Sequence, residues 1–212
     1  MGKEKNNYYV VWSGAKPGIY KSWNDCQKQI NGYPNAKYKG FKRFENAKNA
    51  FEKGPDEYWG KKYFESSLSI EQLKIIGSPN KKSICVDAAW NTSTLEMEYQ
   101  GVMTESGEVI FNEGPFQDGT QNIGEFLAIV HALSYLKKKG SDLIIYSDSR
   151  NAISWVKDKE HRSSLVPTSN NKKIFILLER AVKWLKTNTY PNKILKWETK
   201  AWGENPADFG RK

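Results

Sequence analysis

The chain has 212 residues, a formal net charge of +9 at pH 7 and a pI near 9.3. With 38% hydrophobic and 13% aromatic residues, it is long enough for one well-packed domain and a small second module. Apolar runs of roughly 18 residues are lacking, and the first residues contain no apolar signal-peptide region. We therefore expect a soluble, cytoplasmic protein that does not span a membrane, with a polyanionic partner such as nucleic acid or an anionic membrane surface.

The positive charge is concentrated near the beginning of the chain. Residues 1–54 contain 11 Lys and Arg against 4 Asp and Glu, whereas residues 81–212 contain 19 against 16. Within the basic region the pattern predicts a hairpin, a helix, a strand and a second helix, at residues 8–23, 22–31, 36–42 and 43–54. This pattern indicates a small α+β module over residues 7–54.

The rest of the chain reads as a linker followed by a larger domain. Residues 55–81 contain one possible short helix at 69–76, which a Gly-Pro pair at 54–55 and a Ser-Pro pair at 78–79 flank. From residue 82 onward the pattern predicts five strands (83–90, 96–104, 108–114, 142–149, 193–200). It also predicts helices at 123–140, 150–159 and 172–188, of which the first is read as strongly amphipathic. We expect an α/β domain with a mixed five-stranded sheet and flanking helices over residues 82–212.

The two cysteines are not expected to carry chemistry. Cys26 and Cys85 are far apart and have no Cys or His partner at metal-ligand spacing. Both are predicted to be buried thiols in the core.

Four acidic residues occupy positions that suggest a common site. Asp87 interrupts an apolar strand, and a buried carboxylate needs a cation, hydrogen-bond donors or a shifted pKa. Each of the others has a plain alternative: Glu125 as a helix N-terminal acid, Asp148 as a turn or cap residue after a strand, and Asp208 as part of a helix that begins after Pro206. Together, however, they form the oxygen ligand set that Mg²⁺ prefers.

The motifs "VDAAW", "GTQNIGEFLAIVHAL", "IIYSDSRNAISWVKDK" and "KWETKAWGENPADFGRK" resemble those of a type 1 ribonuclease H of the compact bacterial form. The segment "YYVVWSGAKPGIYKSWNDCQKQINGYPNAKYKGF" is similar to the hybrid-binding, viroplasmin-like module that precedes many of these enzymes. The resemblance implies a ribonuclease H-like fold for the larger domain. It also implies that Asp87, Glu125, Asp148 and Asp208 are catalytic metal ligands, and that Glu204 is a second acid that helps to move metal or product.

The resemblance further implies contacts to nucleic acid in both regions. In the larger domain, Thr120, Asn122 and Ser163 would form a pocket for a DNA-strand phosphate, with Gln121 in the minor groove, and Trp155 would pack against a deoxyribose. In the module, Trp23 and Tyr38 would stack on the hybrid while Lys39 binds phosphate. The alternative for the three aromatic residues is core packing.

The function implied is endonucleolytic hydrolysis of the RNA strand of RNA–DNA hybrids by two Mg²⁺ ions, with Mn²⁺ as a possible substitute, leaving 5′-phosphate and 3′-hydroxyl ends. No obligate protein partner is indicated. The alternative is a non-catalytic protein that binds hybrid or double-stranded RNA and whose nuclease-like domain is structural.

Overall fold

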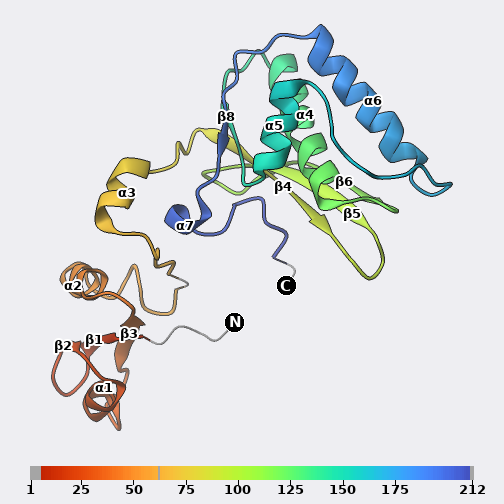
Figure 1. Cartoon of the computed structure of the whole chain (residues 1–212). Helices are drawn as coiled ribbons and strands as arrows, with labels where there is room; N and C mark the ends of the chain where they lie inside the picture. Colours follow the sequence, from red (N-terminus) through yellow and green to blue (C-terminus); the bar gives the residue numbers. More distant parts are fainter. Residues whose placement is uncertain (1–5, 62, 211–212) are drawn as a thin grey trace. The chain divides into compact units, whose positions relative to one another are not determined.

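The computed structural model describes residues 6–61 and 63–210. The chain forms two compact units, Met1–Ser67 and Leu68–Lys212, each with its own sheet and core (Figure 1). Residues 55–81, expected to be a linker, are therefore divided between the two units. Within the described parts of the chain, no helix has the length and apolar character needed to cross a bilayer.

The first unit is a three-stranded antiparallel sheet with a helix on each face. The strand order is β2-β1-β3, formed by β1 (Tyr8–Ser13), β2 (Gly18–Tyr20) and β3 (Lys37–Phe41), and the helices are α1 (Trp23–Ile30) and α2 (Phe44–Lys53). Side chains alternate across a strand, so Val10 packs with Phe41 and the alanines of α2, whereas Val11 packs with Cys26 of α1. The burial of Cys26 confirms its predicted role.

Residues 55–67 pack onto this small sheet. Tyr58 is 4% exposed and joins the core of the α2 face, and the Tyr63 ring lies 5.6 Å from the Phe41 ring. The Glu65 carboxylate accepts hydrogen bonds from the backbone N–H groups of Lys42 (2.7 Å) and Arg43 (2.8 Å), just ahead of α2. Since the α2 N-cap, Arg43, makes no side-chain cap hydrogen bond, Glu65 supplies the acceptors that this helix start needs.

The second unit is built on a five-stranded mixed sheet. The strands are β4 (Ser83–Trp90), β5 (Met97–Met103), β6 (Val109–Phe116), β7 (Ile144–Ser147) and β8 (Ile194–Lys196), in the order β6-β5-β4-β7-β8. The first three strands form an antiparallel meander, and β7 and β8 run parallel to β4. This arrangement confirms the predicted mixed five-stranded sheet with flanking helices.

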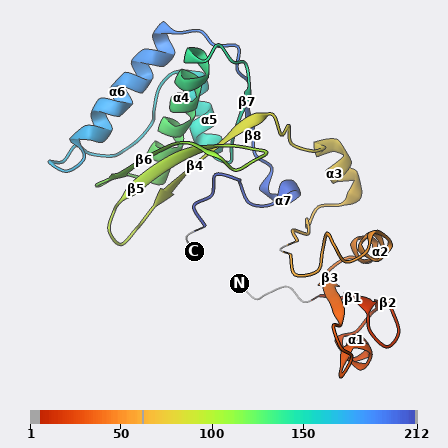
Figure 2. The same ribbon diagram turned by 180° about the vertical axis from the view of Figure 1, so that it is seen from behind.

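The helices of the second unit are α3 (Ile70–Ile76), α4 (Gln121–Lys138), α5 (Arg150–Asp158), α6 (Lys172–Thr187) and the short α7 (Thr199–Trp202). Figures 1 and 2 show α4, α5 and α6 together on one face of the sheet. Ile84, Val86 and Ala88 of β4 pack toward that side, whereas Cys85 packs with Tyr146 and Trp197 in a separate cluster that includes Ala207 of the C-terminal segment. Cys85 is thus a buried core thiol, as predicted.

Helix α4, predicted to be amphipathic, is buried over more of its surface than an amphipathic helix with one apolar face would be. Its residues are buried without interruption from Ile123 to Val130, because the sheet, α5 and α6 all pack against it. Gly124 allows the close approach: a Cβ atom at this position would lie 2.6 Å from the Cβ of Ala88. The tight packing of α4 on β4 fixes the position of the next residue, Glu125.

Candidate active site

The sheet register places Asp87 and Asp148 next to each other. Strands β4 and β7 are parallel neighbours in which Val86 pairs with Ser147. Asp87 and Asp148 each follow one member of that pair, and the carboxyl ends of neighbouring parallel strands meet at the same edge of a sheet. Asp148 lies directly after the end of β7, as expected from the sequence.

Glu125 reaches the same place from the first turns of α4. It is 2% exposed, and its Oε1 accepts a hydrogen bond from Nε2 of Gln121 at 3.0 Å. The Ser147 hydroxyl donates to the other carboxylate oxygen, Oε2, at 3.5 Å. Ligand oxygens of Asp87, Glu125 and Asp148 all lie within 4.8 Å of one another. Glu125 is therefore part of a carboxylate cluster and not only a helix N-terminal acid.

The C-terminal segment brings Asp208 to the cluster. Asn205 is buried and donates a hydrogen bond through Nδ2 to the carbonyl of Val86, the residue before Asp87, at 2.9 Å. Gln100, which pairs with Asp87 in the β4–β5 register, donates to the carbonyl of Ala207 at 2.7 Å. These two anchors hold the residues on either side of Pro206 against the sheet.

The predicted helix after Pro206 is not present. Residues 206 and 207 form a turn, and the short helix α7 lies earlier, at Thr199–Trp202. The turn is closed by a hydrogen bond from the backbone N–H of Asp208 to the Asn205 carbonyl. Glu204 is exposed at the entrance of this turn. It is close enough to Asp148 to raise the pKa of that residue.

The cluster is strongly perturbed electrostatically. The pKa of Asp87 is raised to about 7, mainly by burial and also by the negative charges of Asp148 and Asp208, whereas a hydrogen bond with Glu125 lowers it. Burial and the neighbouring Asp87 raise the pKa of Glu125 well above its ordinary value. Burial also raises the pKa of Asp148, although the positive charge of Lys196 opposes this effect. Without a cation, these acids therefore resist ionising together.

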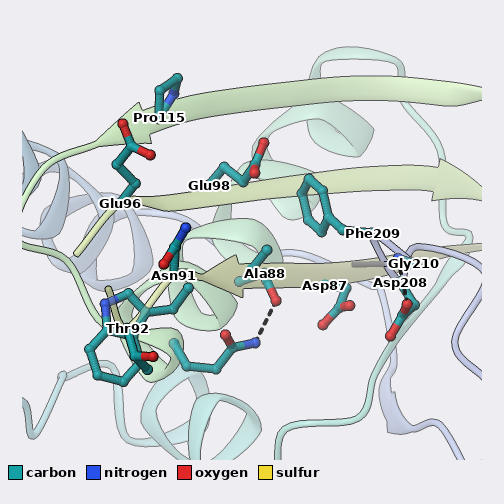
Figure 3. A pocket seen from close by; sticks show the side chains of 13 residues that line it. Asp87, Ala88, Asn91, Thr92, Glu96, Glu98, Pro115, Asp208, Phe209 and Gly210 are labelled. Atoms are coloured by element: carbon teal, nitrogen blue, oxygen red, sulfur yellow. Dashed lines mark hydrogen bonds between the residues drawn. The ribbon is translucent and has the colours of Figure 1, made fainter. Parts of the chain in front are cut away.

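A hollow of about 770 Å³ opens beside the cluster. Its lining includes Asp87, Asp208, Trp90 and the acidic side chains Glu96 and Glu98. In Figure 3 the carboxylates of Asp87 and Asp208 point in the same direction, and the dashed line marks the Gln121 side chain bound to the Ala88 carbonyl. The hollow gives an extended substrate access to the carboxylates.

The donor set fits a divalent metal. Hard carboxylate oxygens within 4.8 Å of one another are suitable ligands for Mg²⁺ or Mn²⁺, and a bound cation would remove the charge repulsion that raises these pKa values. Asp87, Glu125 and Asp148 form the group of potential ligands, and Asp208 lines the adjoining hollow.

The predicted phosphate-binding residues of this unit lie near the start of α4 and in the loop after α5. Thr120 is the N-cap of α4 and makes no side-chain cap hydrogen bond, and Asn122 is exposed in the first turn. The Ser163 hydroxyl accepts from the backbone N–H of Leu165 at 3.1 Å. Trp155 is 8% exposed and packs on Phe126 in the core, which favours the packing alternative for this residue.

In the first unit, Trp23 and Tyr38 form an exposed aromatic pair. Each is 38% exposed, and their ring centroids are 5.7 Å apart. Lys39 follows Tyr38 on the strand and therefore points to the opposite face of the sheet. Its ammonium group donates to the backbone carbonyls of Tyr58 (2.8 Å) and Lys61, and burial lowers its pKa. Lys39 thus holds residues 55–61 against the sheet.

Several residues that build the site were not identified from the sequence. Asn205 and Gln100 position the acidic residues through hydrogen bonds to Val86 and Ala207, and Gln121, predicted only as a minor-groove contact, donates to Glu125. Asn205 lies between the two candidate residues Glu204 and Asp208, and this position was an available signal. The role of Gln100 depends on a partner 107 positions away and had no local signal.

The chain is similar in sequence to known proteins, both in its first unit and over its full length. Residues 7–51 match the family model described as "Ribonuclease H1 N-terminal domain". Over 99% of its length the chain is 24% identical to a ribonuclease H of Schizosaccharomyces pombe, of which 97% is covered. It is 44% identical over 45 residues to a ribonuclease H of Saccharomyces cerevisiae, but the match covers only 13% of that protein. Ribonuclease H1 of Halobacterium salinarum NRC-1 matches 54% of this chain and 83% of that chain at 17% identity and a TM-score of 0.36.

The fold and the site define an α/β domain with a mixed five-stranded sheet and a buried carboxylate cluster, preceded by a three-stranded module. The match of the module and the full-length similarity confirm the resemblance to type 1 ribonuclease H that the motifs indicated.

Proposed function

We propose that this chain hydrolyses the RNA strand of RNA–DNA hybrids endonucleolytically and leaves 5′-phosphate and 3′-hydroxyl ends. The observation that carries the proposal is the convergence of Asp87, Glu125 and Asp148 within 4.8 Å beside an open hollow. It occurs in a chain whose N-terminal module matches a ribonuclease H1 domain and whose full-length relative is a ribonuclease H.

Asp87, Glu125, Asp148 and Asp208 would hold the metal. Two Mg²⁺ ions, or Mn²⁺ in their place, would supply positive charge for the phosphodiester and lower the pKa of the attacking water. The protein contributes the arrangement of ligands: Gln121 and Ser147 orient the Glu125 carboxylate, and Asn205 and Gln100 hold the segment that carries Asp208. Such positioning keeps the ligands in place before substrate arrives.

Glu204 has a different role in this proposal. Glu204 is exposed, whereas Glu125 is almost fully buried. The negative charge of Glu204 raises the pKa of Asp148. An exposed acid at the edge of a metal cluster can attract metal or assist product release without lowering the chemical barrier. We therefore assign Glu204 to metal or product exchange and Asp208 to metal binding.

The first unit would increase affinity for the hybrid. The Trp23–Tyr38 pair offers aromatic faces to sugars or bases, and the excess of Lys and Arg over residues 1–54 attracts phosphates. In the second unit, Thr120, Asn122 and Ser163 remain the proposed contacts to a DNA-strand phosphate. The expected cytoplasmic location also remains a prediction.

The experiment is cleavage of one labelled RNA sequence presented as RNA–DNA hybrid, as duplex RNA and as single strand, each with Mg²⁺ and with EDTA. We expect cleavage of the hybrid alone, and only with metal. The non-catalytic alternative predicts hybrid binding without turnover under every metal condition. An Asp148→Asn variant assayed in parallel excludes a contaminating nuclease.

A further inference from the structure

A second hollow, of about 490 Å³, lies between α4 and α6 next to strands β5 and β6. Its walls come from helical faces with regular spacing: Val130, Ser134 and Lys138 on α4, and Lys173, Leu177 and Arg180 on α6. None of its lining residues belongs to the hollow that contains Asp87 and Asp208. It is therefore a separate site on the same domain.

The charge of this hollow suits an anion. Lys138, Lys173 and Arg180 line it against a single acid, Glu113. Over residues 6–61 and 63–210, none of these three cations forms an ion pair. Lys173 instead lies over the Phe116 ring, 4.9 Å from its centroid. The positive side chains are thus available to a ligand.

A tyrosine hydroxyl adds a polar group to the lining. Tyr99 of β5 is only 4% exposed and lines the hollow. Its phenol has no hydrogen-bond partner in the part of the chain that the structure describes, and it lies near enough to Glu113 and Arg180 for both to influence its pKa. Burial raises that pKa, so the hydroxyl keeps its proton at neutral pH and can donate a hydrogen bond.

Aromatic rings provide the remaining walls. Tyr135 and Trp184 line the hollow together with His131, whose ring stacks on Phe111 with centroids 4.0 Å apart and planes at 15°. Trp184 is itself stacked on Tyr190 at 6.0 Å and 16°. Rings held by such packing can contact a flat ligand at little entropic cost.

We propose that this hollow binds a nucleoside phosphate monoester. Its volume lies within the range of about 300–1,000 Å³ that small-ligand pockets span. Arg180, Lys173 and the Tyr99 hydroxyl would bind the phosphate group, and the rings around Trp184 would contact the base. The inference rests on this hollow alone and does not depend on the nuclease activity proposed above.

The test is titration of the full chain with adenosine 5′-monophosphate by isothermal titration calorimetry, at low salt and with EDTA so that the carboxylate cluster holds no metal. We expect saturable binding of one molecule. Adenosine and inorganic phosphate, titrated separately, should each bind at least about tenfold more weakly, because each lacks one half of the recognised group.

Variants locate the binding. Arg180→Ala should weaken binding about tenfold or more, and Tyr99→Phe, which removes only the hydroxyl, should weaken it several-fold, about the effect of losing one hydrogen bond. Lys183→Ala is the matched control, since Lys183 is exposed on α6, is absent from the lining and removes the same charge. We expect no change in affinity for this control.

Three results would overturn the proposal. The first is no saturable binding at millimolar nucleotide. The second is equal weakening by Arg180→Ala and Lys183→Ala, which would indicate general charge attraction. The third is much tighter binding of a single-stranded oligonucleotide than of the monophosphate, with the same dependence on Arg180, which would assign the groove to a nucleic-acid strand.

Discussion

The two units of this chain differ in the burial of their candidate functional side chains. The second unit places its acids in the interior: Asp87 is 7% exposed and Glu125 is 2% exposed. The first unit leaves Trp23 and Tyr38 on its surface, although these aromatic side chains would contribute more to folding if they were buried. Both arrangements cost stability, one through desolvated charge and the other through exposed apolar surface, and such costs are common at functional sites.

The difference also shows how each unit is stabilised. The second unit has a large continuous core around α4, which can tolerate a repulsive cluster at its edge. The first unit has two small clusters, one on each face of its sheet, and it relies on residues 55–67 for Tyr58 and Glu65. Variants in the second unit should therefore change chemistry at constant fold, whereas variants in the first unit should change binding or stability.

The largest effect is expected for Asp148→Asn. An amide is a poor metal ligand, so turnover of the hybrid should fall by about 1,000-fold, or ~4 kcal/mol, while hybrid binding and the folded state persist. Single-turnover cleavage with Mg²⁺ measures the effect. Asp142→Asn, at an exposed acid just before β7, is the control and should cleave normally. Cleavage close to wild type in Asp148→Asn would remove this residue from the site.

The charge repulsion in the second unit should make the metal-free protein sensitive to pH. Burial raises the pKa of Asp87 to about 7, so between its ordinary value and pH 7 the native state binds more protons than the unfolded state. The free energy of unfolding then decreases as pH rises through that window. In EDTA, Asp87→Asn should stabilise the protein at pH 8 by on the order of 2 kcal/mol and much less at pH 4.

Hydrogen exchange of the α4 amides measures this stability in the full chain, because the most protected amides of a core helix report its unfolding. Equal stabilisation at both pH values would contradict the prediction, since it would show that ionisation of Asp87 is not the cause.

In the first unit, Glu65→Ala should remove the acceptors at the start of α2 and destabilise the unit by about 1–3 kcal/mol. Exchange of the α2 amides should accelerate, while those of α4 remain protected. Glu52→Ala, an exposed acid within α2, is the matched control. If α2 exchange were unchanged in Glu65→Ala, residues 55–67 would be a tether after all.

Trp23→Ala should weaken hybrid binding about tenfold, the lower part of the range for aromatic stacking on a nucleotide. The apparent KM should rise and kcat should remain unchanged, with substantial rescue in Trp23→Phe. Tyr33→Ala, at another exposed aromatic residue of the same unit, serves as the control. A loss of α1 amide protection that accounts for the whole affinity change would favour the core-packing alternative.

The smallest effect is expected for Glu204→Gln. Steady-state turnover should slow by about three- to tenfold, with single-turnover cleavage nearly unchanged, because an acid that assists exchange acts after the bond is broken. Equal loss in both regimes would make Glu204 a metal ligand, and no loss in either would make it an ordinary solvent-exposed acid.

Much of this molecule follows from local sequence patterns. The apolar run around Asp87 predicted strand β4 with its observed bounds, and α5 and α6 were each located to within one residue. The sequence also determined the ligand types, because carboxylates within apolar segments require a cation or a shifted pKa wherever the chain places them. The motifs were sufficient to associate four acids that are spread over most of the second unit.

Only the tertiary structure decided how these acids meet and which neighbours hold them. The pairing of Val86 with Ser147 places Asp87 beside Asp148. The hydrogen bonds of Asn205 and Gln100 hold the segment around Pro206 against the sheet, where a helix was expected. The tertiary structure alone also shows that Lys39 donates hydrogen bonds to the carbonyls of residues 58 and 61. Local patterns report propensity and burial, whereas these contacts join residues far apart in the chain, and their free energy exists only once the sheet has formed.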